Sequence, residues 1–239
     1  MADRPIVFSA AMVLALLAGT KTQTRRILAR QDWPEGIVRQ HPHQTAGVPC
    51  LPGDRLWVRE ALGRRPASLF GIEATNGAEA AFYKADESDV LDRDGFNLVP
   101  GWKGPTCSPR HMPRAMSRLT LTVGDVRVQR LQDISEEDAR AEGATMRPKC
   151  RGFRDQYDGW SMDWSEVGKP SRFGSNEGHL DESDVSLGSA TAAFAGFINA
   201  LHDPRWNLKG DGIWGENPWV AAISFSTTPA NIDSPREQP

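Results

Sequence analysis

The stretch SRLTLTVGDVRVQRL, residues 117–131, constrains the fold of this 239-residue chain more than any other segment. Apolar and polar side chains alternate through it on both sides of Gly124, which is the pattern of a β-strand with one buried face. A segment of this length forms either one long bent strand or a hairpin that turns at the glycine. Both alternatives place a β-sheet in the fold.

Shorter segments add strands, and few segments favour helices. The patterns predict strands near residues 4–8, 53–60, 79–85 and 219–226, and helices near 10–18, 136–142 and 190–201. Several short strands with few helices favour a mainly β fold with some α (α+β), in the form of a small, largely antiparallel β-barrel decorated by helices and long loops. Such a barrel leaves a cleft at one mouth.

Two polar stretches interrupt this pattern within what we expect to be one domain over residues 1–226. Residues 86–116 are rich in Gly, Pro and Asp, and residues 147–188 are polar without clear periodicity, so both are expected to be long loops. The insertions are placed at about 63–108 and 147–188. The last residues, 227–239, have the composition of a disordered tail.

Charge and cysteine usage limit the class of protein. The formal net charge is −3, whereas proteins that coat nucleic acid usually carry a basic excess, so any contact with nucleic acid is expected to be local. The cysteines Cys50, Cys107 and Cys150 do not form a disulfide framework and favour a cytoplasmic location. The apolar run 10–18 is too short to cross a membrane, and no membrane contact is expected.

The segment GTKTQTRRIL, residues 19–28, follows that run directly and contains no acid. In a strand Thr24 and Arg26 share a face while Arg25 points away, and Lys21 can fold over them from the preceding turn. A desolvated lysine beside arginines has a lowered pKa and can act as a base, and a nearby threonine hydroxyl can then become a nucleophile. The alternative is that Lys21 only interacts with the dipole of the preceding helix.

The segment DISEEDARAEGA, residues 133–144, predicts a helix that is capped by Ser135 and ends at Gly143. Glu142 then lies in the last turn, where the helix dipole disfavours a negative charge. An acid at this unfavourable position indicates a functional role for Glu142. The alternative is that Glu142 is a solvated surface acid.

Basic and aromatic residues supply candidates for binding. Residues 21–30 and 103–118 contain no acid. They form either one phosphate-facing rim, in which Arg25, Arg110, Arg114 and Arg118 hold phosphates, or ordinary solvated faces. Trp57 and Trp219 are candidates for stacking on a base, although most tryptophans belong to a core. The spacings of His41, His43 and Cys50, and of Cys107 and His111, match no tetrahedral site, so neither a metal nor another cofactor is expected.

Together these segments resemble the ASCH family, a branch of the PUA-like small β-barrels. GTKTQTRR fits the family pattern G-x-K-x-x-T-x-R at Gly19, Lys21, Thr24 and Arg26. GDRLWVRE looks like the second family segment, RLQDISEEDARAEG like its helix with the glutamate, and NPWVAAISF like its closing strand. The segments are most similar to the versions found in bacteriophage and prophage genomes, and the resemblance covers about residues 5–62, 109–145 and 213–226.

The resemblance implies a barrel whose cleft binds RNA, nucleosides or modified bases, and a location in a bacterial or phage-infected cell. One small bacterial branch removes the acetyl group of N4-acetylcytidine with a lysine, a threonine and a glutamate, which carry over to Lys21, Thr24 and Glu142. The expected partner is therefore a nucleoside or single-stranded nucleic acid, and the expected activity an amidohydrolase. The alternatives are a non-catalytic RNA or modified-DNA binding module and a ribonuclease. The residues expected to contact the substrate are Arg26, Trp57, Arg114, Arg118 and Trp219.

Overall fold

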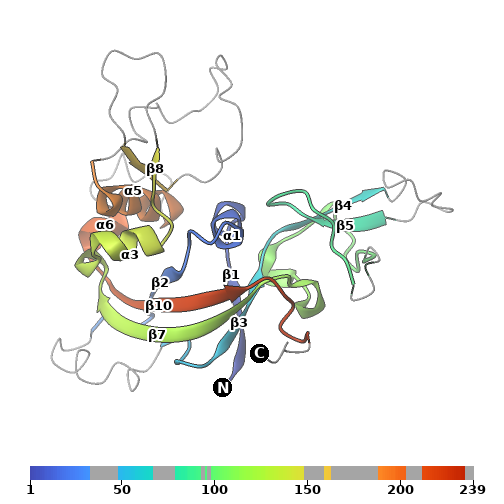
Figure 1. Cartoon of the computed structure of the whole chain (residues 1–239), viewed down its shortest axis with the longest axis horizontal. Helices are drawn as coiled ribbons and strands as arrows, with labels where there is room; N and C mark the ends of the chain where they lie inside the picture. The colour runs from blue at the N-terminus through green and yellow to red at the C-terminus, as the bar shows by residue number, and fades with distance from the viewer. Residues whose placement is uncertain are drawn as a thin grey trace, which may run out of the picture. The chain divides into compact units, whose positions relative to one another are not determined.

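The fold is mixed α and β, with a sheet-rich core and few helices (Figure 1). The computed structural model describes residues 1–32, 48–66, 79–92, 95, 98–147, 159–162, 188–202 and 212–234. Within the described ranges, no helix is long and apolar enough to span a bilayer. The chain divides into two compact units. The first unit comprises Met1–Leu17, Gly53–Thr122 and Ser226–Pro239, and the second comprises Ala18–Pro52 and Val123–Phe225.

The largest sheet has five strands in the order β1-β3-β7-β10-β2. In the first unit, β1 (Asp3–Val7) lies parallel to β3 (Arg55–Arg59), and β3 pairs antiparallel with the start of β7 (Thr120–Arg130). In the second unit, β10 (Trp219–Thr228) pairs antiparallel with β2 (Gln23–Ile27). Among the described residues this order ends at β1 and β2, so closure into a barrel stays a prediction.

The alternating segment at the centre of the sequence forms one strand, β7, and the hairpin alternative is wrong. Leu121 and Val123 are buried before Gly124, and Val126 and Val128 are buried after it, so the buried positions change phase at the glycine. A change of phase with unbroken strand structure is what a bent strand produces, whereas a hairpin would need a turn at this point.

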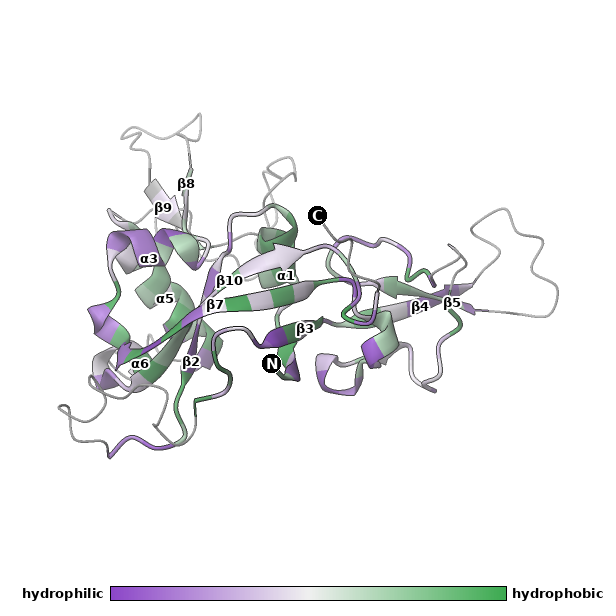
Figure 2. Cartoon of the chain, turned by 60° about the horizontal axis from the view of Figure 1, so that its bottom comes forward, coloured by the Kyte–Doolittle hydropathy of each residue, from purple (hydrophilic) through white to green (hydrophobic). Residues whose placement is uncertain are grey.

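The helices form where the sequence predicts them. In the first unit, α1 (Ala10–Leu17) buries Met12, Val13 and Leu16, as its apolar composition requires. In the second unit, the Ser135 hydroxyl accepts a hydrogen bond from the Asp138 backbone at the start of α3 (Glu136–Ala141). The neighbouring α5 (Ala190–His202) is largely apolar (Figure 2) and is followed by the short α6 (Gly212–Glu216). The Glu136 carboxylate accepts hydrogen bonds from the first backbone N–H groups of α5, which ties α3 to α5.

Residues 62–116 contain a small sheet. Within the stretch 86–116, which was expected to be a long loop, the described residues include one short strand and two 3-10 helices. The strands β4 (Leu62–Pro66), β5 (Glu79–Tyr83) and β6 (Thr106–Cys107) pair in the order β5-β4-β6. Two 3-10 helices, η3 (Pro109–His111) and η4 (Arg114–Met116), follow. The sheet has its own core, which is Leu62, Ala81, Tyr83, Val90, Cys107, Met112 and Met116. Ala81 and Tyr83 belong to β5, which was predicted as the strand near residues 79–85. The other core residues do not form a continuous helical or strand period, so the pattern did not reveal them.

A two-stranded sheet opens the second insertion. It pairs β8 (Thr145–Arg147) with β9 (Gly159–Ser161), and most of the remainder up to residue 187 lies outside the described residues.

The tail expected to be disordered from residue 227 is structured as far as Ser234. β10 continues to Thr228, and Ile232 is buried. The Asn231 amide donates hydrogen bonds to the carbonyls of Arg114 and Ser117, at 2.9 and 2.7 Å. The composition suggested disorder because these polar side chains look solvent-exposed, whereas their partners lie more than 100 residues away along the chain.

Replacing Asn231 with alanine is expected to lower the free energy of unfolding by about 1–2 kcal/mol, because the backbone acceptors at the end of η4 lose their donor. Chemical denaturation, followed by tryptophan fluorescence, measures this difference. Ser226→Ala, at an exposed position of β10, is the matched control and is expected to change stability by less than about 0.5 kcal/mol. Equal stability of both variants would show that the C-terminal segment does not stabilise the first unit.

Candidate active site

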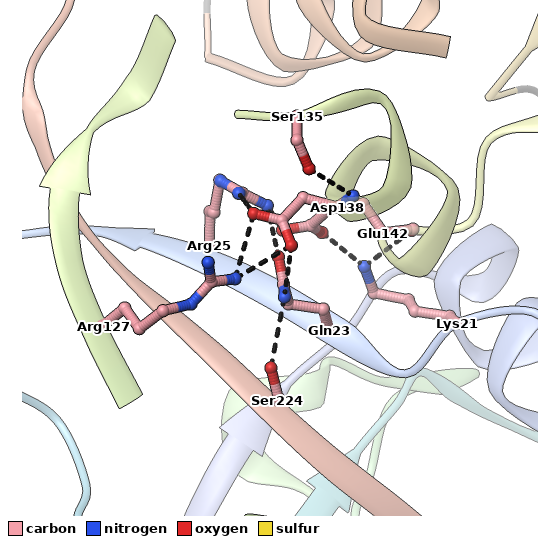
Figure 3. Close-up of polar contacts among 8 residues, drawn as sticks. All are labelled: Lys21, Gln23, Arg25, Arg127, Ser135, Asp138, Glu142 and Ser224. Atoms are coloured by element: carbon pink, nitrogen blue, oxygen red, sulfur yellow. Dashed lines mark hydrogen bonds and ion pairs between the residues drawn. The ribbon is translucent and has the colours of Figure 1, made fainter. Parts of the chain in front are cut away.

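A buried ion pair joins Lys21 to Glu142 in the second unit. Lys21 precedes β2, and Glu142 follows the last residue of α3, where Gly143 adopts a φ of 108° and ends the helix. The Thr22 N–H donates to the Ala141 carbonyl at 2.8 Å, which brings the two ends together. The Lys21 Nζ then donates to Glu142 Oε2 at 2.7 Å and to the Glu142 backbone carbonyl at 2.9 Å (Figure 3). The two residues, 121 positions apart in sequence, therefore meet as the sequence analysis required.

Burial determines the electrostatics of this pair. Lys21 is 1% exposed and Glu142 is 3% exposed. Burial lowers the pKa of Lys21 below the usual 10.5; the Glu142 carboxylate opposes this shift, and the charges of Arg26 and Arg25 add to it. A buried lysine with a lowered pKa, hydrogen-bonded to a carboxylate, gives up its proton more readily than an ordinary lysine and is a candidate for proton transfer.

Arg25 does not point away from the pair, which corrects the expectation that it holds phosphates. It is 6% exposed, and its Nη1 donates to Glu142 Oε1 at 3.1 Å while its Nη2 donates to Asp138 Oδ2 at 2.7 Å (Figure 3). The Gln23 side chain accepts from Arg25 and donates to Asp138. The sequence could have predicted this position. If strand alternation is counted from Lys21, residues 21, 23 and 25 lie on one face.

Thr24 belongs to the same strand but has a different position. It is 2% exposed, pairs with Ile223 of β10, and by strand alternation its Cβ lies on the face opposite to Gln23 and Arg25. Among the described residues we see no hydrogen bond of the Thr24 hydroxyl. The structure therefore brings Lys21 and Glu142 together without showing Thr24 in contact with either.

Arg26 lies close enough to the pair to affect it electrostatically. Burial lowers the pKa of Arg26, and the Glu142 carboxylate opposes that shift. Its charge also contributes, after burial, to a lowered pKa of His202 on α5. A positive charge at this point is suited to stabilising an anion next to Lys21.

Both candidate tryptophans are buried under arginine side chains. Trp219 of β10 is 1% exposed, and the Arg130 guanidinium lies 4.3 Å from its ring centroid. In the first unit, Trp57 of β3 is 6% exposed, with the Arg59 guanidinium at 4.5 Å. Their role in base stacking stays a prediction, because a base would have to replace an arginine that already occupies a ring face.

Two arginines of the basic stretch 103–118 form ion pairs with acids from other segments of the first unit. Arg114 donates to Asp233 and Asp3 at 2.7 and 2.8 Å. Arg118 makes a bidentate pair with the buried Glu60, at 2.8 and 2.9 Å. Phosphate binding by these two arginines stays a prediction, and it would require phosphate to compete with the ion pairs.

Neither a metal-binding group among the described residues nor a similar protein indicates the function of this site. Among the described residues, no three His, Cys, Asp or Glu side chains gather into a group that could hold a metal; His41, His43 and Cys150 lie outside them. No protein-family model matches the chain, and no curated protein and no solved structure is significantly similar to it.

Proposed function

We propose that the chain is an amidohydrolase that removes an acyl group from the exocyclic N4 of cytosine, in a nucleoside or in single-stranded nucleic acid. The observation that carries this proposal is the buried Lys21–Glu142 ion pair at 2.7 Å. The substrate class comes from the resemblance of GTKTQTRR and the α3 segment to the ASCH family. A PUA-like barrel with a base-binding cleft at its mouth is part of the same proposal.

The energetics of the pair support a chemical role. Moving an ammonium and a carboxylate out of water costs several kcal/mol per ion, and apolar residues of similar volume often stabilise a protein as well or better. Stability alone is therefore a weak reason to keep Lys21 and Glu142 at positions that are nearly inaccessible to solvent. Proton transfer is a stronger reason, because it needs a close pair whose members can exchange a proton.

In the proposed reaction the pair works with one shared proton. Lys21 passes a proton to Glu142, and the neutral amine then accepts the proton of the Thr24 hydroxyl as its oxygen attacks the amide carbonyl. Glu142 donates its proton to N4 as the C–N bond breaks, which leaves an acyl ester on Thr24. Water hydrolyses the ester: Glu142 takes a proton from the water as its oxygen attacks the ester carbonyl, and Lys21 returns one to the threonine oxygen as the C–O bond breaks. Glu142 then passes its proton to Lys21, which restores the ion pair. Arg26 stabilises the oxyanion in both steps.

A base-binding module without catalysis is the second candidate. The observation that favours it is the position of Thr24, whose Cβ lies on the face of β2 opposite to Arg25. In this alternative, Lys21 and Glu142 supply a donor and an acceptor to the edge of a base, and no bond is broken.

The direct test is to incubate the purified chain with N4-acetylcytidine and to follow the release of cytidine by chromatography. We expect the wild type and Lys84→Met, a change at an exposed lysine, to release cytidine at equal rates, and Lys21→Met to release it about 10²–10⁴-fold more slowly. Release by Lys21→Met at the wild-type rate would eliminate this mechanism. Binding of N4-acetylcytidine by the wild type without any release would favour the second candidate.

A further inference from the structure

A row of alternating charges extends from Lys21 across the second unit, and we call it the charge row. Each member contacts the next: Lys21 and Glu142 at 2.7 Å, Glu142 and Arg25 at 3.1 Å, Arg25 and Asp138 at 2.7 Å, and Asp138 and Arg127 at 2.8 Å (Figure 3). The lysine end is buried, whereas the side chain of Arg127 is 45% exposed. Solvent therefore screens the far end of the row much more than the end at Lys21.

Glu142 uses its two oxygens differently. Oε2 accepts from Lys21 at 2.7 Å, and Oε1 accepts from Arg25 at 3.1 Å. Oε1 accepts from a guanidinium, which does not transfer its protons to a carboxylate, so Oε2 is the oxygen that can exchange a proton with Lys21. Arg25 thereby fixes both the orientation of the carboxylate and the oxygen at which it can act.

Arg25 is itself held firmly. Gln23 Oε1 and Asp138 Oδ2 accept from it at 2.6 and 2.7 Å, and the Phe194 ring of α5 lies 5.6 Å from the guanidinium carbon. Asp138 is anchored in turn, because Gln23 and Arg127 both donate to its carboxylate (Figure 3). These contacts leave Arg25 little freedom to turn towards a substrate.

We infer that Arg25 and Asp138 are positioning residues of the active site: Arg25 orients Glu142 towards Lys21, and Asp138 balances the charge of Arg25. As a statement about catalysis, this rests on the proposed function. The charged groups that face Lys21 are Glu142 of α3 and Arg25 and Arg26 of β2. Removing the charge of Arg25 therefore makes Lys21 hold its proton more tightly, whereas removing that of Asp138 leaves Arg25 unbalanced and has the opposite effect.

The experiment is a titration of Lys21 by NMR, using protein labelled with ¹³C in its six lysines. The Lys21 signal is assigned by its loss in Lys21→Met. We expect the midpoint of Lys21 to move up by about one pH unit in Arg25→Gln and down by a similar amount in Asp138→Asn. Arg127→Gln, at the exposed end of the charge row, is the control and is expected to move the midpoint much less.

The opposite directions of the two expected midpoint shifts distinguish positioning from a general loosening of the structure. If the variants only loosened the structure, water would reach Lys21 and both midpoints would rise towards that of an ordinary lysine. Midpoints that move in the same direction, or do not move, overturn the inference. The titration needs no substrate, so opposite shifts in a protein that does not hydrolyse N4-acetylcytidine would support the positioning roles while rejecting the proposed function.

Discussion

Replacing Glu142 with glutamine is expected to lower the free energy of unfolding by about 3–5 kcal/mol, although the amide has nearly the same shape. The reason is that Lys21, which is 1% exposed, would lose the carboxylate that compensates its charge. Denaturation in urea at neutral pH measures the loss. Glu137→Gln is the matched control, because it makes the same chemical change at an exposed position of α3; we expect it to alter stability by less than about 0.5 kcal/mol.

Removing the lysine of the pair is expected to destabilise the protein less than removing the charge of the glutamate. In Lys21→Met the Glu142 carboxylate keeps its bond to Arg25 at 3.1 Å, so the remaining charge still has a buried partner. We expect a loss of about 1–3 kcal/mol, smaller than that of Glu142→Gln. A larger loss in Lys21→Met than in Glu142→Gln would mean that Arg25 does not compensate Glu142 as the geometry indicates.

The second large effect is expected on the rate of hydrolysis. Removing Lys21 should slow the release of cytidine by about 10²–10⁴-fold, which is the usual contribution of a positioned proton-transfer group. The wild-type rate should also fall on the alkaline side, because in the proposed mechanism the pair works only while it shares one proton. Burial lowers the pKa of Lys21, so this fall should occur below pH 10.5 as the ammonium loses its proton.

Initial rates of cytidine release between about pH 6 and pH 11, a range that includes the ordinary pKa of lysine, check both parts of this prediction. A residual rate in Lys21→Met should show no corresponding alkaline fall. A wild-type rate that keeps rising up to and beyond the ordinary pKa of lysine would contradict the shared-proton mechanism, because it would require Lys21 to act only after it has lost its proton to solvent.

Local patterns in the sequence predicted most of the regular elements. The helices α1 and α3 and the long strand β7 follow from apolar periodicity and capping, which depend on residues close together in the chain. Of the small sheet of residues 62–116, the sequence predicted only β5, as the strand near residues 79–85. The rest was missed because core residues such as Cys107 and Met112 are isolated among polar neighbours. The burial of these core residues depends on tertiary packing, which cannot be read from a short stretch of sequence.

The site was predictable only in part, for a similar reason. The pairing of Lys21 with Glu142 was anticipated through the resemblance to a family and not through any local pattern. Lys21 was expected to fold over Thr24 and Arg26, with Arg25 pointing away. In the structure Lys21 and Arg25 both donate to the Glu142 carboxylate. The ion pair of Arg118 with Glu60 could not be foreseen either, because it joins residues 58 positions apart.

We propose that the buried Lys21–Glu142 pair is present for chemistry and not for stability. The most direct test is the double variant Lys21→Met/Glu142→Met, for which denaturation and the release of cytidine from N4-acetylcytidine are measured on the same preparation. We predict a protein at least as stable as the wild type, because an apolar pair replaces two buried charges, and no release of cytidine. Release of cytidine by the double variant, or a loss of stability greater than that of either single variant, would contradict the claim.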